Sequence, residues 1–284
     1  MLALKENSRK LIAGGIALCL LLAALAVFYN RGERHLLSYQ YFPGSSFNSN
    51  VDMEITQNIY RYGEGSTSTG HLRYTVSSRV LAVEDDGVAT IEEKWVRQDD
   101  GQAPQEFNLN EIYPLIGETI VFRADPSGKV LEVTGISGDG QINEVEVAQW
   151  KASRYRLPGK LVAVGAGWSN REEMPLKDGA KTTIRTESRL KNIFTEGVEK
   201  VAEIQIHQEI PIDQETNQQG MTVRTTGKLI MEAGMLFNLT RGEEKSFDGE
   251  IDFKTANEVT HADGKVVLVN GDMLIKVRER GAGS

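Results

Sequence analysis

One uncharged run constrains this chain more than any other feature. It comprises the nineteen residues 11–29, and three basic residues precede it. A helix of that length measures about 28 Å, close to the ~30 Å hydrocarbon core of a bilayer. We therefore expect a cytoplasmic tail at 1–10, a single transmembrane signal-anchor at 11–29, and a large part outside the cytoplasm. A slight excess of basic residues before the run favours that orientation.

The same run is also compatible with a secretory signal peptide. Ala24-Leu25-Ala26 has the A-x-A pattern of a cleavage site, and cleavage there would release a secreted protein. Against cleavage, Val27, Phe28 and Tyr29 continue the apolar run, so the anchor is the favoured interpretation. A lipoprotein signal is not expected, because the residue before the only cysteine, Cys19, is the large Leu18. The outer part then contains no disulfide and no thiol group.

Composition bounds the possible partners. The chain has 32 basic and 40 acidic residues, a net charge of −8, and no basic run. This balance argues against nucleic acid as a partner. The residues after the apolar run are enough for a domain with a substantial core. We expect a linker at 30–38, one β-rich domain at 39–280 and a loose tail at 281–284.

Alternation of apolar and polar residues dominates the domain. Leu72, Tyr74, Val76 and Val80 alternate with polar neighbours, and Thr182, Ile184, Thr186 and Leu190 do so again further on. This period of two is typical of antiparallel strands with one buried face. The predicted fold class is mainly β, a large curved antiparallel sheet with one amphipathic helix packed on it.

The helix is expected at 143–157, where strict alternation stops. Glu144 and Glu146 come early, basic residues come late, and Pro158-Gly159 ends the segment. Acids at the start and bases at the end complement the helix dipole, and Asn143 can cap the first turn. The predicted apolar face consists of Ile142, Val145, Ala148, Ala152 and Tyr155.

The sequence also suggests two similar halves, at 39–135 and 160–245, joined by this helix. At an offset of 110 residues, Ser78-Arg79 falls on Ser188-Arg189 and Gly87-Val88 falls on Gly197-Val198. Further along, Gly117 meets Gly227 and Ile120 meets Ile230. Two such units, each too small to close alone, could share one continuous curved sheet.

Two stretches carry a resemblance to a known family. The first is Gly117-Glu118-Thr119-Ile120-Val121-Phe122-Arg123-Ala124-Asp125-Pro126-Ser127-Gly128-Lys129-Val130, and the second is Leu157-Pro158-Gly159 followed by Val164-Gly165-Ala166-Gly167-Trp168. They resemble uncharacterised exported bacterial envelope lipoproteins with internally similar β halves, whose architecture is similar to the half-barrel of lipoprotein-carrier proteins. The resemblance covers about residues 39–242 and implies a curved sheet with a helix over it. It implies no catalytic residue, and this chain departs from the family in lacking a usable lipobox.

No local motif indicates chemistry. The four histidines, His35, His71, His207 and His261, are too far apart in sequence for a local metal site, and no nucleophile elbow or calcium loop is present. Only His207, which lies near Glu209, calls for inspection. We predict no catalytic, cofactor-binding or metal-binding residues and no cofactor, although residues far apart in the chain could still assemble a site in space.

The functional expectation is a membrane-anchored, extracytoplasmic binding module that is not an enzyme. It would hold a lipid or other apolar ligand, or a protein partner, on the curved sheet. The alternative is a structural or assembly subunit of a cell-envelope complex without a small-molecule ligand. An apolar cavity of at least ~300 Å³ would favour the first, and a filled core the second.

Overall fold

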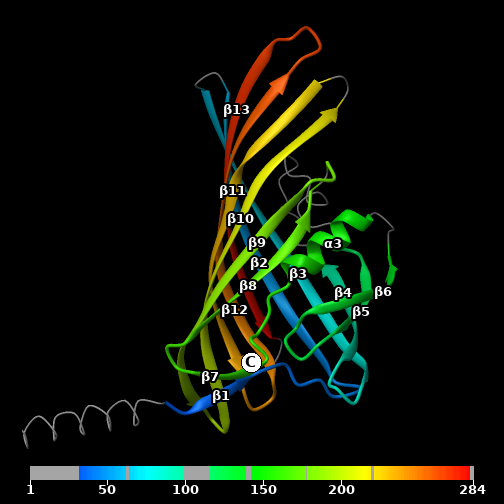
Figure 1. The fold of residues 1–284 in the computed structure, drawn as a ribbon, viewed down its shortest axis with the longest axis vertical. Helices are drawn as coiled ribbons and strands as arrows, with labels where there is room; N and C mark the ends of the chain where they lie inside the picture. The colour runs from blue at the N-terminus through cyan, green and yellow to red at the C-terminus, as the bar shows by residue number, and fades with distance from the viewer. Residues whose placement is uncertain are drawn as a thin grey trace, which may run out of the picture.

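The computed structural model describes residues 32–61, 64–98, 115–138, 142–176, 178–218 and 221–281. The predicted tail at 1–10 and membrane segment at 11–29 lie outside these ranges, as does all of the predicted tail at 281–284 after Gly281. In the part of the chain that is described, no helix is long and apolar enough to cross a membrane. As predicted, the fold is mainly β, with a large antiparallel sheet and one helix (Figure 1).

Eleven strands form the main sheet, in the order β6-β5-β4-β3-β2-β13-β12-β11-β10-β9-β8. Two runs of sequential neighbours, β2–β6 and β8–β13, meet where β2 pairs with β13. The strands are β2 (Ser46–Arg61), β3 (Glu64–Val83), β4 (Ala89–Arg97), β5 (Thr119–Ala124), β6 (Val130–Ser137), β8 (Gly167–Pro175), β9 (Lys181–Glu196), β10 (Glu199–Gln218), β11 (Met221–Asn238), β12 (Glu243–Thr260) and β13 (Val266–Gly281).

The alternation in sequence corresponds to one buried face, which we call the inner face. Leu72, Tyr74 and Val80 on β3 are buried, as are Ile184 and Leu190 on β9. The strand registers place all five on this same face, where they join the hydrophobic clusters of their respective halves. The prediction that Tyr74 and Ile184 share a face is therefore confirmed.

The sheet has a base and a tip. At the base, the connector after β1 is bonded to two hairpin turns that lie far apart in sequence: Tyr39 N donates to Pro126 O (2.8 Å) and Gln40 N to Gly242 O (2.9 Å). These bonds hold the curled sheet together at this end. A separate two-stranded ribbon, β1 (Arg34–Leu37) with β7 (Lys160–Ala163), lies at the base. Strand β1 thus falls inside the segment 30–38 that we predicted to be a linker.

The tip has no core. In the tip halves of the central strands, at 56–61, 64–69, 211–217, 221–232 and 247–274, no side chain is buried, and exposure simply alternates from residue to residue. The long hairpins extend upward as one layer (Figure 1). All the buried apolar residues lie in the base half, where the sheet curls around them.

The helix is shorter than predicted. Helix α3 (Glu144–Ser153) begins with the expected Asn143 cap, which forms a capping box with Glu146, but it ends four residues before Leu157 because Arg154 adopts an extended backbone. The predicted apolar face is also only partly right. Trp150 and Ala152 are the buried residues, whereas Val145 and Ala148 remain half-buried.

Helix α3 lies between the two edge strands of the sheet. Lys151 Nζ donates to Leu131 O on β6 (2.7 Å), and Gln149 Nε2 donates to Pro175 O on β8 (2.9 Å). An edge strand exposes unpaired backbone carbonyls, and covering an edge with a helix is one way in which proteins protect it. Helix α3 therefore covers both edges of the sheet at once, in the connection between the two halves.

The two runs of strands are built alike in detail. Gly44 N donates to Val80 O and Val80 N to Ser45 O; in the same way Gly165 N donates to Leu190 O and Leu190 N to Ala166 O. Val80 and Leu190 are 110 residues apart, the offset read from the sequence. Each is followed by a bulge, since the ladder skips Leu81 in one half and Lys191 in the other.

The constant offset does not persist past the hairpin. Ile91 pairs with Val80, whereas Ile204 pairs with Leu190, so the following strand is displaced by 113 residues rather than 110. The predicted match of Ile120 with Ile230 is therefore wrong. Ile230 pairs with Glu209, on the opposite face from the buried Gln208, whereas Ile120 is fully buried on the inner face. The second half needs three more residues because its hairpin arms are longer.

Candidate functional site

Histidines do not gather in the described part of the chain. His207 lies in the middle of β10, and its Nδ1 is 2.6 Å from Glu232 Oε1 on β11 rather than paired with Glu209. His35 lies 3.9 Å from Glu33, and His261 lies in the turn before β13. No group of three or more His, Cys, Asp or Glu among the residues described could hold a metal ion.

A charged group instead occupies the inner face at the base, centred on Arg154. Arg154 Nη1 donates to both carboxylate oxygens of Glu93, each at 3.2 Å. Glu93 also accepts a hydrogen bond from Trp95 Nε1 (2.9 Å). Its side chain is 3 % exposed, but that of Arg154 is 35 % exposed. The ion pair is therefore anchored on a buried carboxylate and presents a partly accessible guanidinium.

The end of helix α3 explains how this arginine reaches the inner face. The extended backbone at Arg154 turns the chain out of the helix, and Leu157 N then donates to Ser127 O at the base (2.9 Å). The guanidinium carbon lies 5.5 Å from the ring centres of both Phe122 and Trp150. Arginine over aromatic faces gains cation–π attraction, so these two rings help to fix the side chain.

Three tyrosines border the same region. Tyr39 and Tyr41, from the connector after β1, stack with ring centres 5.9 Å apart, and Tyr39 meets Phe237 edge to face at 5.4 Å. Tyr155 donates to Ser188 Oγ (3.2 Å). Burial raises the pKa of all three phenols, so they stay neutral and serve as hydrogen-bonding groups.

Two further carboxyl groups complete the charged group. Glu244 on β12 and Glu279 on β13 are half-buried on the inner face. Burial, and then the charge of Glu279, raise the pKa of Glu244 to about 8, although Arg154 opposes that rise. Burial also raises the pKa of Glu279, while a hydrogen bond with Ser49 and the charge of Arg154 oppose it. Near neutral pH, Glu244 therefore holds a proton much of the time.

Sequence reasoning missed this group, although one signal was present. Ile91, Glu93 and Trp95 alternate with Glu92 and Lys94, so period two places Glu93 on the apolar face. An acid at an inward position of a strand is the anomaly that could have been found. Arg154 was assigned to the helix end, and nothing local shows that it meets Glu93, 61 residues away.

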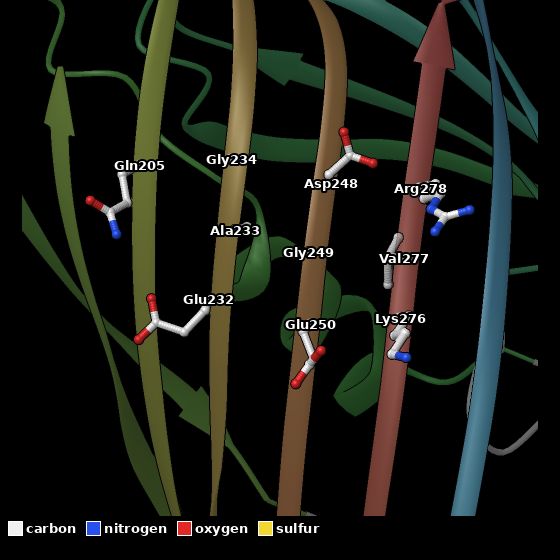
Figure 2. Close-up of a pocket in the computed structure, with 10 residues that line it drawn as sticks. All are labelled: Gln205, Glu232, Ala233, Gly234, Asp248, Gly249, Glu250, Lys276, Val277 and Arg278. Carbon is white, nitrogen blue, oxygen red and sulfur yellow. The ribbon is translucent and has the colours of Figure 1, made fainter. Parts of the chain in front are cut away.

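The opposite, outer face carries a shallow depression of about 480 Å³ over β10–β13 (Figure 2). Its floor is small because Gly234 has nothing within 4 Å of the place where a side chain would begin. Figure 2 shows mostly charged side chains around it, and the cavity is open to solvent rather than enclosed. They are Glu232, Asp248, Glu250, Lys276 and Arg278, with Gln205. The depression is thus not the apolar enclosure that a buried ligand would need.

Comparison with known proteins adds little. No family model and no curated protein matches the sequence. Among solved structures, the crystal structure of the ywiB protein from Bacillus subtilis is similar at 12% identity, over 83% of this chain and 93% of that chain, with a TM-score of 0.13. A TM-score this low does not show a shared fold.

Proposed function

We propose that this chain is a non-catalytic binding module, held at a membrane by residues 11–29 with its sheet outside the cytoplasm. The inner face binds a ligand or a partner segment that is apolar along its length and polar at one end. The polar end meets the group around Arg154, Glu244 and Glu279 at the base. The resemblance to exported envelope lipoproteins is compatible with this location and remains a prediction.

One observation carries the proposal, and it comes from comparing the two halves. Ser78 pairs with Glu93, whereas the equivalent Ser188 pairs with Ile206. In the other direction, Glu244 occupies the position that Val130 holds in the first half, since each lies opposite the last residue of an equivalent ladder. The same strand positions therefore accept an apolar side chain. The curled sheet does not require these acids.

Energetics make the acids costly to keep. Taking a carboxylate out of water costs several kcal/mol by order of magnitude, and a buried ion pair is often no better for stability than apolar side chains of the same size. The raised pKa of Glu244 reflects this cost. Groups that a fold does not need, and that cost stability, are candidates for a binding role.

The inner face above this group supplies the apolar part. Phe247, Ile251 and Phe253 on β12 follow one another toward the tip on that face, and each remains half-buried rather than sealed in the core. Leu229 and Met231 on β11 and Met273 on β13 lie opposite them in the ladder or next to them. A ligand lying along these strands would cover this apolar surface.

Native mass spectrometry of the full chain, released from mild detergent, tests the proposal. The wild-type protein should carry a bound ligand that gas-phase activation releases. Glu279→Gln, which removes the inner charge without changing shape, should carry less of it. Glu250→Gln, on the exposed outer face, should match the wild type. A ligand-free monomer in the wild type, or equal loss in both variants, would refute binding at this site.

A second candidate, a subunit of an envelope assembly, is favoured by the tip. Tyr60, Val266 and Leu268 are 44%, 49% and 64% exposed on the single-layer part of the sheet. Exposed apolar side chains on a sheet without a covering layer are typical of protein interfaces. The same mass spectra distinguish the two functions, because an assembly subunit would appear as an oligomer or a complex without a small ligand.

A further inference from the structure

The ribbon at the base exposes apolar side chains on the face turned away from the core. Leu36 on β1 and Leu161 on β7 lie directly opposite each other and are 52% and 58% exposed. The other face of the ribbon already packs on the core through Leu37 and Val162, which are 0% and 6% exposed. A ribbon with one face in the core normally turns polar residues to water on the other. Here both faces are apolar.

Further apolar side chains lie close to this pair. Val198, in the β9–β10 turn, is 95% exposed, and Val164, after β7, is 50% exposed. The ion pair between Lys200 Nζ and Glu33 (3.2 Å) joins the β9–β10 turn to the start of β1. The bond from Gly165 N to Leu190 O (2.7 Å) joins the residue after Val164 to β9. The exposed apolar residues therefore gather at one end of the molecule.

The length of the connection fixes what lies next to this end. The apolar run ends at Tyr29 and β1 begins at Arg34, so only residues 30–33 separate them. Five Cα-to-Cα steps span at most about 18 Å. The headgroup layer on each side of the hydrocarbon core is roughly 5–8 Å thick. If residues 11–29 span a bilayer, β1 begins within or just outside the headgroups.

We infer that the outward face of this ribbon, Leu36 and Leu161 with Val164 and Val198, docks on the surface of the membrane that holds residues 11–29. This inference rests on the anchoring part of the proposed function. The exposed cations Arg34 and Lys160, on the same two strands, lie where they can meet lipid phosphates. Apolar side chains that enter the headgroup boundary, together with nearby cations, are the usual basis of binding at an interface.

Docking fixes the direction of the sheet. The eighteen residues of β12 extend from the base toward the tip. At about 3.4 Å per residue they span roughly 60 Å. With the base on the membrane, the tip and the open end of the inner face point away from it, toward the surrounding compartment. A ligand or partner would then approach from the side opposite the bilayer.

Site-directed spin labelling of the full chain in vesicles of phosphatidylcholine and phosphatidylglycerol tests the inference. Cys19→Ser removes the only natural cysteine, and Leu161→Cys or Leu36→Cys then places a nitroxide on the ribbon. Leu268→Cys, 64% exposed on the single-layer part of the sheet, is the matched control. The ribbon label should favour collision with oxygen over a water-soluble nickel chelate several-fold more than the control label.

The outcomes separate the two proposals. If the chain floats with the vesicles but the labels at 161 and 36 collide with the nickel chelate as readily as the label at 268, docking is wrong and anchoring stands. If the chain does not float with the vesicles at all, the anchor is wrong and docking falls with it. Two labels are used so that poor folding of one variant does not decide the result.

Discussion

Replacing Arg154 with methionine should destabilise the protein, because it leaves Glu93 without its cation. Methionine keeps a similar length and an apolar stem, so the change removes mainly the charge and its hydrogen bonds. Glu93 is 3 % exposed and cannot turn to water. Removing one partner of a buried ion pair typically costs about 3–5 kcal/mol.

That range needs a reduction here. The Arg154 side chain is 35 % exposed, so water already screens part of its attraction to Glu93. We therefore expect a loss of about 2–3 kcal/mol in the free energy of unfolding. For a domain of this size, each kcal/mol corresponds to roughly 2–4 °C in Tm, so the expected decrease is about 4–12 °C.

A second substitution separates the charge effect from lost packing. The equivalent half carries Ile206 where this half carries Glu93, so Arg154→Met combined with Glu93→Ile should recover much of the loss. It should not recover all of it, because Trp95 Nε1 loses its acceptor, at a cost of about 1 kcal/mol. Thermal unfolding followed by far-ultraviolet circular dichroism measures all three proteins. A double variant no more stable than Arg154→Met would show that the charge pairing is not the cause.

Three further predictions concern single sites. The raised pKa of Glu244 means that the folded state binds a proton more tightly than the unfolded state, so stability should fall as pH rises from about 4.5 to about 8, and Glu244→Gln should flatten that fall in Tm. Gly128→Ala should cost about 1–3 kcal/mol more than Gly179→Ala in the free energy of unfolding. Both glycines have positive φ, but only at Gly128 would the new Cβ lie 2.6 Å from the Tyr39 ring; equal losses in urea titrations would contradict this. Asn143→Ala should cost about 1 kcal/mol in the same titrations, because the cap of α3 loses its bond to Glu146 N (3.0 Å), and no loss would contradict the capping box.

Much of the fold could be predicted because strands advertise themselves locally. A period of two fixes which side chains share a face, and this was enough to place Tyr74 and Ile184 together across two separate strands. The helix start was equally local, since Asn143 and Glu146 form the whole capping signal. Its end was not, because Arg154 leaves the helix for an ion pair with a residue on β4. A local pattern cannot report a partner that is distant in sequence.

The candidate site could not be predicted for the same reason. Arg154, Glu93 and Glu244 come from a helix end and two strands of different halves, and only the curl of the sheet brings them together. The offset between the halves failed in a related way. A longer hairpin shifts every later residue by three positions without changing the alternation, so sequence alone gives no warning that Ile120 and Ile230 face opposite ways.

The position of helix α3 links the fold to its chemistry. A curled sheet of two similar halves leaves two edges, and helix α3, in the connection between the halves, covers both through Lys151 and Gln149. The residue that ends this helix is Arg154, so the segment that protects the edges also delivers the only cation known to pair with Glu93 in the described structure. Covering the edges and placing the inner charge are therefore not independent. A change that shifts the helix should move Arg154, and a change at Arg154 should loosen the edges on either side of it.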